Sequence, residues 1–438
     1  MSVTLRGAFW IGVYVFVAVA PLIFTGLGIS QPGQGWVRDF SVALGFVGLA
    51  MMTLQFALIA RFEGVAAPFG MDAVLQYHRQ IAYVATAFVI THPVLLFVDD
   101  PRKLRLLDFT TAPNRARFAV SATVALLLLM ATSIWRRQMR LRYELWQLLH
   151  GLLAVAIVAL ALAHAAGVGY YVARPWQRAL WMAMSAALVG LLGWVRVLKP
   201  LWRYRHPWRV ESIHAEHGNA WTMVMRPEGH PGFRFQPGQF AWVMVGGAPV
   251  ARTPHPVARA ARAEDGERVA MTIKARGDFT GTIAKVQPGT RVYLDGPHGV
   301  FSPDRFEGPG FVLIAGGVGI TPIISMVRTM ADRQDPRPCL LLYANRDWDG
   351  VTFRDELDEL ARRTPLTVVH VLEKAPAGWQ GETGYITEAV LRRHLPKRFE
   401  RMQYFVCGPG PMMDAMDLAL CKVGVSAERI NTERFDMV

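Results

Sequence analysis

Four of the twelve histidines lie within or at the ends of long apolar stretches, and they form two pairs with one spacing. His78 and His92 are separated by 14 residues, as are His150 and His164. On an α-helix 14 residues turn about 1400° and rise about 21 Å, so each pair projects from one face, near opposite ends of its helix. Two such helices entering from the same side place two imidazoles at each of two levels. The spacing predicts two bis-histidine sites, each able to hold a haem iron from both axial faces.

Two alternatives compete with haem ligation. Histidines that merely pack in a core are one, but ionisable groups within membrane spans are costly and usually functional. A shared spacing on two helices is also hard to obtain by chance. A metal site without haem is the other alternative, but it needs its ligands gathered at one point, whereas these four divide between two levels. We therefore expect His78, His92, His150 and His164 to be metal ligands.

The elements that must hold these histidines are stretches without Asp, Glu, Lys or Arg. Each is long enough, or nearly so, to cross a bilayer. They cover 7–37, 40–60, 80–98, 118–135, 145–173 and 179–195, the first and fifth including flanking loop. The mean hydropathy of the chain is +0.23. We predict a membrane six-helix bundle over residues 1–203, with an uncleaved first span and the lipid bilayer as partner.

The basic residues indicate the orientation of these spans. Residues 1–200 contain 17 Lys and Arg against 7 Asp and Glu, and so carry +10 of the net charge of +13. They lie between apolar stretches rather than on a soluble face with interleaved aromatics, so we expect no nucleic-acid partner. The most basic segments, 136–142 and 196–205, are separated by two spans and share a side; 99–117 is mildly basic too. The positive-inside rule predicts a multi-pass protein of the inner cell membrane with both termini cytoplasmic.

After residue 203 the sequence reads as soluble protein. Alternating apolar runs and Gly/Pro turns, as at 237–245 and 291–301, predict a small antiparallel β-barrel over 204–305. Strand-like runs then alternate with helical ones, which predicts an α/β domain with a parallel sheet over 306–438. The cysteines Cys339, Cys407 and Cys421 lack metal-ligand spacing and suggest no disulfide framework, so we place this half in a reducing compartment.

A glycine-rich turn joins strand and helix in LIAGGVGITPIISM, residues 313–326. Gly316, Gly317 and Gly319 would let the backbone approach a pyrophosphate, whose charge the following helix N-terminus favours. The helix opens with Thr321 and Pro322. A second strand–turn–helix segment, YFVCGPGPMM, covers 404–413.

These motifs resemble two known families. The pairs of histidines on the third and fifth of six spans are similar to those of the ferric reductase transmembrane domain, a family that includes NADPH oxidases. This resemblance implies that the four histidines are axial ligands of two b-type haems. GGVGITP and the Cys-Gly-Pro turn resemble the ferredoxin–NADP reductase family over nearly all of 207–438. That resemblance implies FAD in the barrel and NAD(P)H on the α/β domain.

The second resemblance also implies individual roles. It implies that Cys407 lies beside the nicotinamide and that Phe435 stacks on the flavin until nicotinamide displaces it, with Glu433 nearby. We expect these three residues to be catalytic. Simple packing of Cys407 and Phe435 is the alternative. The implied cofactor-binding residues are Gly238, Gln239, His255, Pro256, Lys274, Thr280, Gly296, Pro297, Gly299, Gly316, Gly317, Gly319, Thr321, Pro322, Arg346, Cys407, Gly408, Pro409 and Phe435.

Thr280 and Arg346 carry more specific expectations. Thr280 is expected to be the N-cap of a short helix under the FAD pyrophosphate. Arg346 could meet a 2′-phosphate through its paired donors, which favours NADPH over NADH, or it could be a solvated loop charge.

The flavin motif departs from the family pattern. HPVARAA at 255–261 keeps His255 and Pro256, but Ala258 and Ala261 replace hydroxyl residues that would bond the isoalloxazine edge, and Arg259 stands where an apolar residue is usual. Backbone amides could still serve the flavin. A degenerate flavin site, with a haem domain fed by other proteins, is therefore an alternative.

The resemblances together imply an NAD(P)H oxidase or ferric-chelate reductase. Electrons would pass from NAD(P)H through FAD and the two haems to an outer acceptor, either O2 or a ferric chelate. Tyr170, Tyr171 and Arg174 in the last outer loop could meet an anionic acceptor, although an interfacial aromatic belt with one snorkelling Arg is the favoured explanation. The alternative function is an electron-transfer subunit that feeds a periplasmic partner protein.

Overall fold

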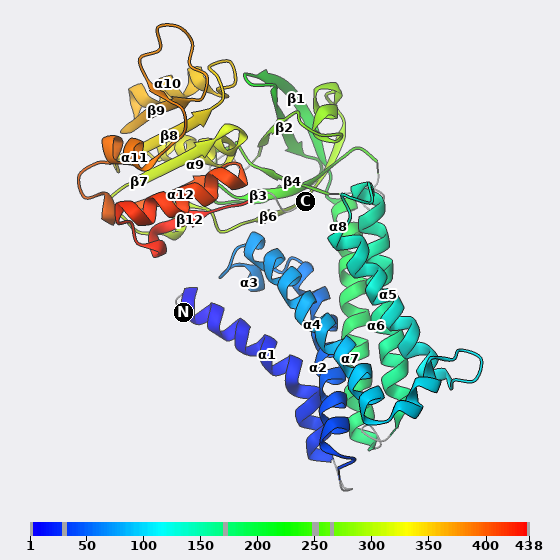
Figure 1. The fold of residues 1–438 in the computed structure, drawn as a ribbon. Helices are drawn as coiled ribbons and strands as arrows, with labels where there is room; N and C mark the ends of the chain where they lie inside the picture. Colours follow the sequence, from blue (N-terminus) through cyan, green and yellow to red (C-terminus); the bar gives the residue numbers. More distant parts are fainter. Residues whose placement is uncertain (1–2, 29–32, 170–173, 248–253, 263–266, 436–438) are drawn as a thin grey trace. The chain divides into compact units, whose positions relative to one another are not determined.

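The computed structural model describes residues 3–28, 33–169, 174–247, 254–262 and 267–435. Contacts divide the chain into two compact units. A helical unit comprises 1–69 and 73–198, and a second unit comprises 70–72 and 199–438. Figure 1 shows helices alone in the first unit and mixed strands and helices in the second. The predicted boundaries at 203/204 and 305/306 remain predictions.

Six helices of the described chain are long and apolar enough to cross a membrane, as expected. The helices are α1 (Val3–Gly28), α2 (Trp36–Ile59), α4 (Met71–Asp99), α5 (Asn114–Ile134), α6 (Tyr143–Val168) and α7 (Pro175–Gly193). A π-helical turn, η2 (Trp194–Leu198), follows α7, and short helices α3 (Glu63–Ala66) and η1 (Pro101–Leu107) lie in connections. Several helices extend past the uncharged stretches, because a span tolerates charged residues where its ends reach the interface. Thus α4 includes Asp72 and Arg79.

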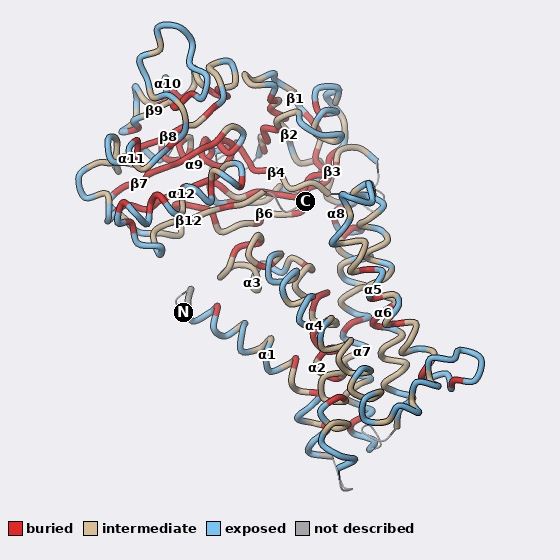
Figure 2. The backbone as a smooth tube through the Cα atoms, viewed as in Figure 1, coloured by how far each residue is buried: buried red, intermediate tan, exposed pale blue. Residues whose placement is uncertain are grey.

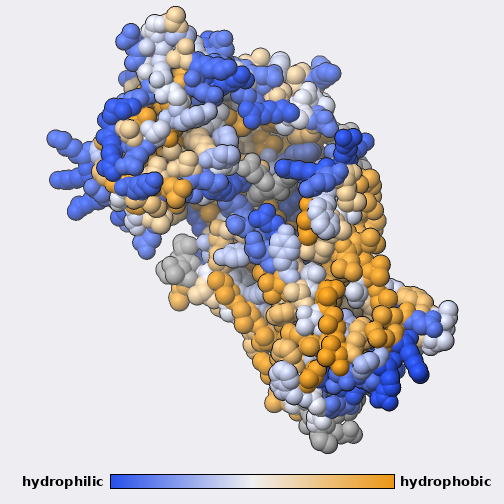
Figure 3. Space-filling view, viewed as in Figure 1, coloured by the Kyte–Doolittle hydropathy of each residue, from blue (hydrophilic) through white to orange (hydrophobic). Residues whose placement is uncertain are grey.

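The outer surface of this bundle is apolar. Leu27, Val98 and Val189 are 74%, 71% and 68% exposed, and Figure 3 shows hydrophobic side chains gathered over the helices. Inside, small residues allow close packing: a Cβ on Gly48 of α2 would lie 2.8 Å from the Val89 side chain of α4. An apolar exterior around a tightly packed interior fits a bundle surrounded by lipid.

The second unit begins with α8 (Lys199–Arg205) and an antiparallel sheet. The strands are β1 (Trp208–Glu216), β2 (Ala220–Pro227), β3 (Phe240–Val245), β4 (His255–Ala258), β5 (Val269–Lys274) and β6 (Arg291–His298), in the order β4-β3-β6-β1-β2-β5. A bridge between Arg259 and Met271, with a bond from Ala260 N to Ala270 O of 2.9 Å, joins the two edge strands and curls the sheet. The expected β-barrel is thereby confirmed. Helix α8 is fixed to β6, where Lys199 Nζ lies 2.9 Å from an Asp295 carboxylate oxygen.

The rest of this unit is a parallel sheet covered on both faces. Its strands are β7 (Phe311–Gly316), β8 (Cys339–Asn345), β9 (Leu366–Leu372), β10 (Glu382–Thr383), β11 (Gln403–Cys407) and β12 (Ile430–Thr432), in the order β10-β9-β8-β7-β11-β12. Helices α9 (Ile320–Asp332) and α10 (Arg354–Arg363) contribute to the core on one face, and α11 (Glu388–His394) and α12 (Gly410–Val423) to the core on the other. Figure 2 shows the central strands β7, β8 and β11 almost continuously buried. The strand order reverses between β7 and β11, where ligands of such folds bind.

Candidate functional site

The histidine pairs predicted from spacing come together between α4 and α6. The ring centroids of His78 and His150 are 6.4 Å apart, with planes at 59°, and those of His92 and His164 are 6.4 Å apart, at 58°. A metal–imidazole bond of about 2 Å, with roughly 1 Å more to the ring centre on each side, places two axial imidazole centres about 6 Å apart. Both pairs therefore have the separation that one shared metal ion requires.

At one level, backbone carbonyls hold the rings. His92 Nδ1 lies 2.8 Å from the Ser41 carbonyl oxygen and 3.1 Å from its hydroxyl, and His164 Nδ1 lies 2.9 Å from the carbonyl oxygen of Arg115. A ligating histidine commonly donates its second ring N–H to such an acceptor, which fixes the ring and leaves the other nitrogen for the metal. Gly45 leaves room for this arrangement, because a Cβ added at this position would lie only 3.2 Å from the His92 ring.

At the other level, the support differs. His150 Nδ1 lies 3.2 Å from the Ser133 hydroxyl, and the Trp146 ring lies 5.1 Å from that of His150. His78 Nδ1 is buried without a hydrogen-bond partner in the described chain. The sequence argument did not find Ser41, Ser133 or Arg115, because spacing along one helix carries no signal for a partner on another.

The described residues contain no group of three or more His, Cys, Asp or Glu side chains able to hold a metal ion. The donor set is thus two separate pairs of imidazoles. Two axial nitrogens per ion fit haem, whose porphyrin supplies the remaining ligands, and do not complete a tetrahedral metal site.

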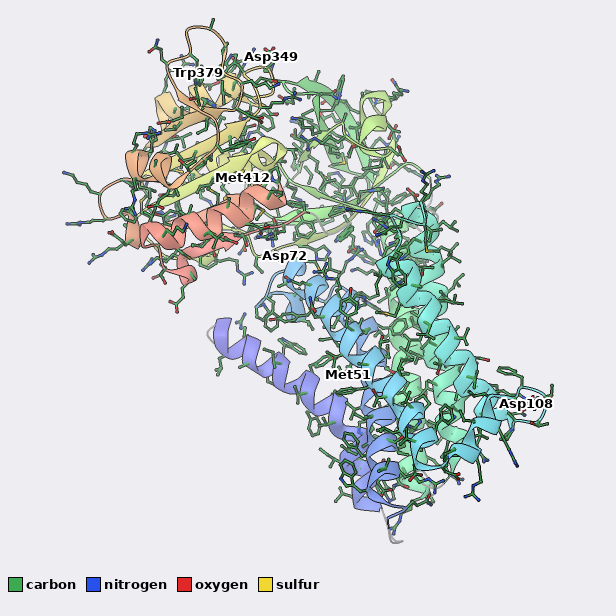
Figure 4. The ribbon with its side chains drawn as sticks, viewed as in Figure 1. Met51, Asp72, Asp108, Asp349, Trp379 and Met412 are labelled. Carbon is green, nitrogen blue, oxygen red and sulfur yellow. The ribbon has the colours of Figure 1, made fainter. Side chains whose placement is uncertain are left out.

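The two glycine-rich turns of the nucleotide motif meet backbone to backbone. Strands β7 and β11 are neighbours, with Ala315 opposite Cys407. A Cβ on Gly319 would lie 2.6 Å from the Cys407 carbonyl carbon and 2.9 Å from the Gly408 Cα. Gly316 is similarly enclosed by Pro409 and by Met412 at the start of α12, labelled in Figure 4. Only glycine fits at these positions, so the expected pyrophosphate turn lies at the point where the strand order reverses.

The three residues expected to be catalytic lie near this edge. Cys407 is 1% exposed, and burial raises the pKa of its thiol, so it stays protonated and is no thiolate nucleophile. Burial, and then the charge of Asp72, raise the pKa of Glu433 well above its usual range, because a buried carboxylate loses the hydration that stabilises its charge. Phe435 packs edge-on against Phe240, with ring centroids 5.7 Å apart.

The turns that flank the expected flavin position are joined to one another. Gln239 Nε2 donates to the Gly299 carbonyl at 3.1 Å. A Cβ on Gly299 would lie 2.6 Å from Glu433 Oε1, so the turn after Gly296 and Pro297 passes directly beside this carboxyl. The Gly238 amide donates to the Ser325 hydroxyl at 3.5 Å.

The role expected of Thr280 as a helix cap is wrong. Thr280 starts the short helix η3 (Thr280–Lys285), but Phe279 is the N-cap, and the Thr280 hydroxyl accepts bonds from the amides of Arg276 and Gly277 at 3.0 and 2.8 Å. A hydroxyl bonded back to the preceding loop cannot also cap the amides that follow. His255 stacks on the Phe279 ring at 3.9 Å.

Other expected residues are placed as follows. Burial lowers the pKa of Lys274, which lies at the end of β5 near Asp347. Arg346 is exposed in the loop after β8. Arg174 precedes α7 as its N-cap. Tyr170 and Tyr171, which the sequence suggested as contacts of an anionic acceptor, lie outside the described residues.

Arg259 of the altered flavin motif is fully buried. Its guanidinium carbon lies 4.2 and 4.1 Å from the ring centroids of Phe233 and Phe235. Within the described chain its guanidinium nitrogens have no hydrogen-bond partner, and burial lowers the pKa of this group. Two aromatic faces stabilise the cation in place of an anion. Arg259 thus occupies the interior position that an apolar residue usually fills.

Comparison with known proteins follows the same division of the chain. A model of the family described as ferric reductase like transmembrane component matches residues 44–161, and the oxidoreductase NAD-binding domain matches residues 313–417. NADH-cytochrome b5 reductase 1 of Lodderomyces elongisporus is 36% identical over 151 residues, 34% of this chain and 50% of that protein. The protein of the same name in Candida albicans is 33% identical over 151 residues, 34% of this chain and 51% of that protein. The chain therefore spans about half the length of these curated relatives.

Among solved structures, flavohemoglobin from Malassezia yamatoensis with bound FAD and heme has a TM-score of 0.50 at 16% identity. The match covers 91% of this chain and 97% of that one, and at this identity it concerns the fold alone.

These matches define the class: the chain is a multi-pass membrane protein that is similar to ferric reductases over 44–161 and to oxidoreductases that bind NAD over 313–417. More particularly, a ferric reductase-like transmembrane segment is followed in the same chain by an oxidoreductase NAD-binding domain. The transmembrane match includes His78, His92 and His150 and ends three residues before His164.

Proposed function

We propose that this protein carries electrons from cytoplasmic NAD(P)H through FAD and two b-type haems to an acceptor on the outer side of the inner membrane. The observation that carries the proposal is the pair of 6.4 Å imidazole separations, because each matches axial ligation of one iron. Bound FAD accepts a hydride, and bound haems relay single electrons. The basic segments 136–142 and 196–205 support the cytoplasmic placement.

The chain's own residues position these groups. His78 and His150 would hold one iron and His92 and His164 the other, with Ser133, Ser41 and the Arg115 carbonyl fixing the rings. The turns at 316–319 and 407–409 leave backbone space for a dinucleotide pyrophosphate. Glu433 offers a buried carboxyl beside the Gly299 turn that can hold or exchange a proton.

The overall reaction balances with two one-electron acceptors. One NAD(P)H reduces two molecules of O2 to superoxide, or two ferric chelates to ferrous ones, and releases NAD(P)+ and one proton. Glu433 is the group we propose to exchange that proton. The preference for NADPH over NADH remains a prediction that rests on Arg346.

The test is a visible spectrum of the purified full-length protein in detergent, recorded anaerobically before and after NADPH or NADH. We expect about two b-type haems per chain, retained FAD, and haem reduction by a pyridine nucleotide. Oxygen and ferric citrate are then added separately to the reduced protein. A protein without haem would refute the histidine assignment. Haem reduced by dithionite but not by either nucleotide would point to the degenerate flavin site, and reduced haem inert to both acceptors would favour a periplasmic partner protein.

A further inference from the structure

Arg196 is a charged residue in an unusual place. It lies within the last candidate membrane span, Pro175–Arg205, in the π-helical turn η2 that follows α7. A π turn inserts an extra residue into a helix and is frequent at functional sites. An arginine within a span is costly unless it meets an anion or reaches water.

The guanidinium of Arg196 lies against the helix that carries the histidines. Its Nη2 is 3.1 Å from the position that a Cβ would occupy on Gly151, the residue directly after His150. The absence of a side chain at Gly151 leaves the space for this approach. The cation is therefore placed beside one metal ligand rather than at a random point of the surface.

No acidic side chain in the described chain forms an ion pair with Arg196. Other basic residues pair with acidic residues of the helical unit: Lys103 with Asp99, Arg102 with Asp100, and Arg142 with Glu144. The guanidinium of Arg196, which is exposed, is thus open to an anion brought by a ligand. A planar guanidinium matches a carboxylate or phosphate through two parallel hydrogen bonds.

We propose that Arg196 binds a carboxylate of the porphyrin held by His78 and His150. The proposal rests on the proposed function, since that function brings a dianionic porphyrin to this level. A cation paired with a haem carboxylate offsets negative charge near the iron and so favours the reduced form. A lipid phosphate offers the same chemistry to an arginine near the end of a span, and the experiment must separate the two sources.

The experiment is an optical redox titration of the full-length protein in phosphatidylcholine nanodiscs, for the wild type, Arg196→Gln, Arg196→Lys and Arg137→Gln. Arg137 is the matched control, because it is an exposed arginine in the basic segment 136–142. We expect Arg196→Gln to lower the midpoint potential of one haem only. The ratio of reduced to oxidised haem at fixed potential should fall about tenfold, or about 59 mV for one electron. Arg196→Lys should restore part of the shift, and Arg137→Gln should cause none.

Three results would overturn the proposal. Two unchanged potentials in Arg196→Gln would show that no haem carboxylate meets this cation. A shift that appears only when phosphatidylglycerol is added to the nanodiscs would assign Arg196 to an anionic lipid headgroup. Loss of the haem in Arg196→Gln and in Arg196→Lys alike would show that the side chain serves folding. A wild-type protein without haem would instead refute the proposed function, and its spectrum alone reveals that case.

Discussion

Gly319 lies where the nucleotide turn meets the Cys407 turn, and its replacement by alanine should open the dinucleotide site. The added Cβ would lie 2.6 Å from the Cys407 carbonyl carbon and 2.9 Å from the Gly408 Cα. Both atoms belong to the backbone, so no flexible side chain can move aside. Inserting a methyl group into a well-packed interior costs about 1–3 kcal/mol. If the turns separate to relieve the clash, that energy appears as nucleotide affinity weakened by a factor of about 5 to 150.

The assay is stopped-flow reduction of the bound flavin by NAD(P)H, measured against nucleotide concentration in the full-length protein. Gly319→Ala should raise the half-saturating concentration, while the haem spectrum after dithionite stays as in the wild type. Gly12→Ala is the matched control, because no atom lies within 4 Å of the Cβ position on this residue, which lies in α1. An unchanged half-saturating concentration and thermal stability in Gly319→Ala would refute the claim that these turns are held in backbone contact.

Three further predictions concern other parts of the site. His92→Ala should lower the haem content from about two to about one per chain, measured by pyridine haemochrome against protein, and retention of both haems would contradict the pairing with His164. Because the pKa of Glu433 is raised in the folded protein, its stabilising contribution is complete below about pH 4.5. That contribution is lost by about 1.4 kcal/mol per unit as pH rises towards the folded pKa. Glu433→Gln should therefore flatten the fall of the thermal unfolding temperature above pH 4.5, and an unaltered pH profile would show that the carboxyl is solvated. Arg259→Met should leave the unfolding temperature unchanged or higher, because it replaces a buried unpaired cation with an apolar side chain of similar length; weaker FAD retention in this variant would instead reveal that the cofactor supplies an anion to Arg259.

The sequence by itself determined the parts of this protein that depend on local periodicity. A repeat of 14 residues places two histidines on one face of any helix, whatever surrounds it, and α4 and α6 carry the pairs as expected. The six apolar stretches and the alternation of strands and helices after residue 306 gave the architecture for the same reason. A turn such as GGVGITP is likewise a local feature, because its glycines and the following helix start are adjacent in the chain.

Only the tertiary structure decided which residues far apart in the chain meet. Ser41 supports His92 across 51 residues, and Gly319 touches the Cys407 turn across 88. Helix period and turn composition contain no information on such partners, because these depend on how whole elements pack. The same limit explains Thr280, whose hydroxyl bonds to a loop conformation that the sequence pattern did not specify, and Arg259, whose aromatic neighbours no pattern in the sequence indicated. The aromatic rings that make its burial tolerable belong to Phe233 and Phe235, which only the folded barrel brings to it.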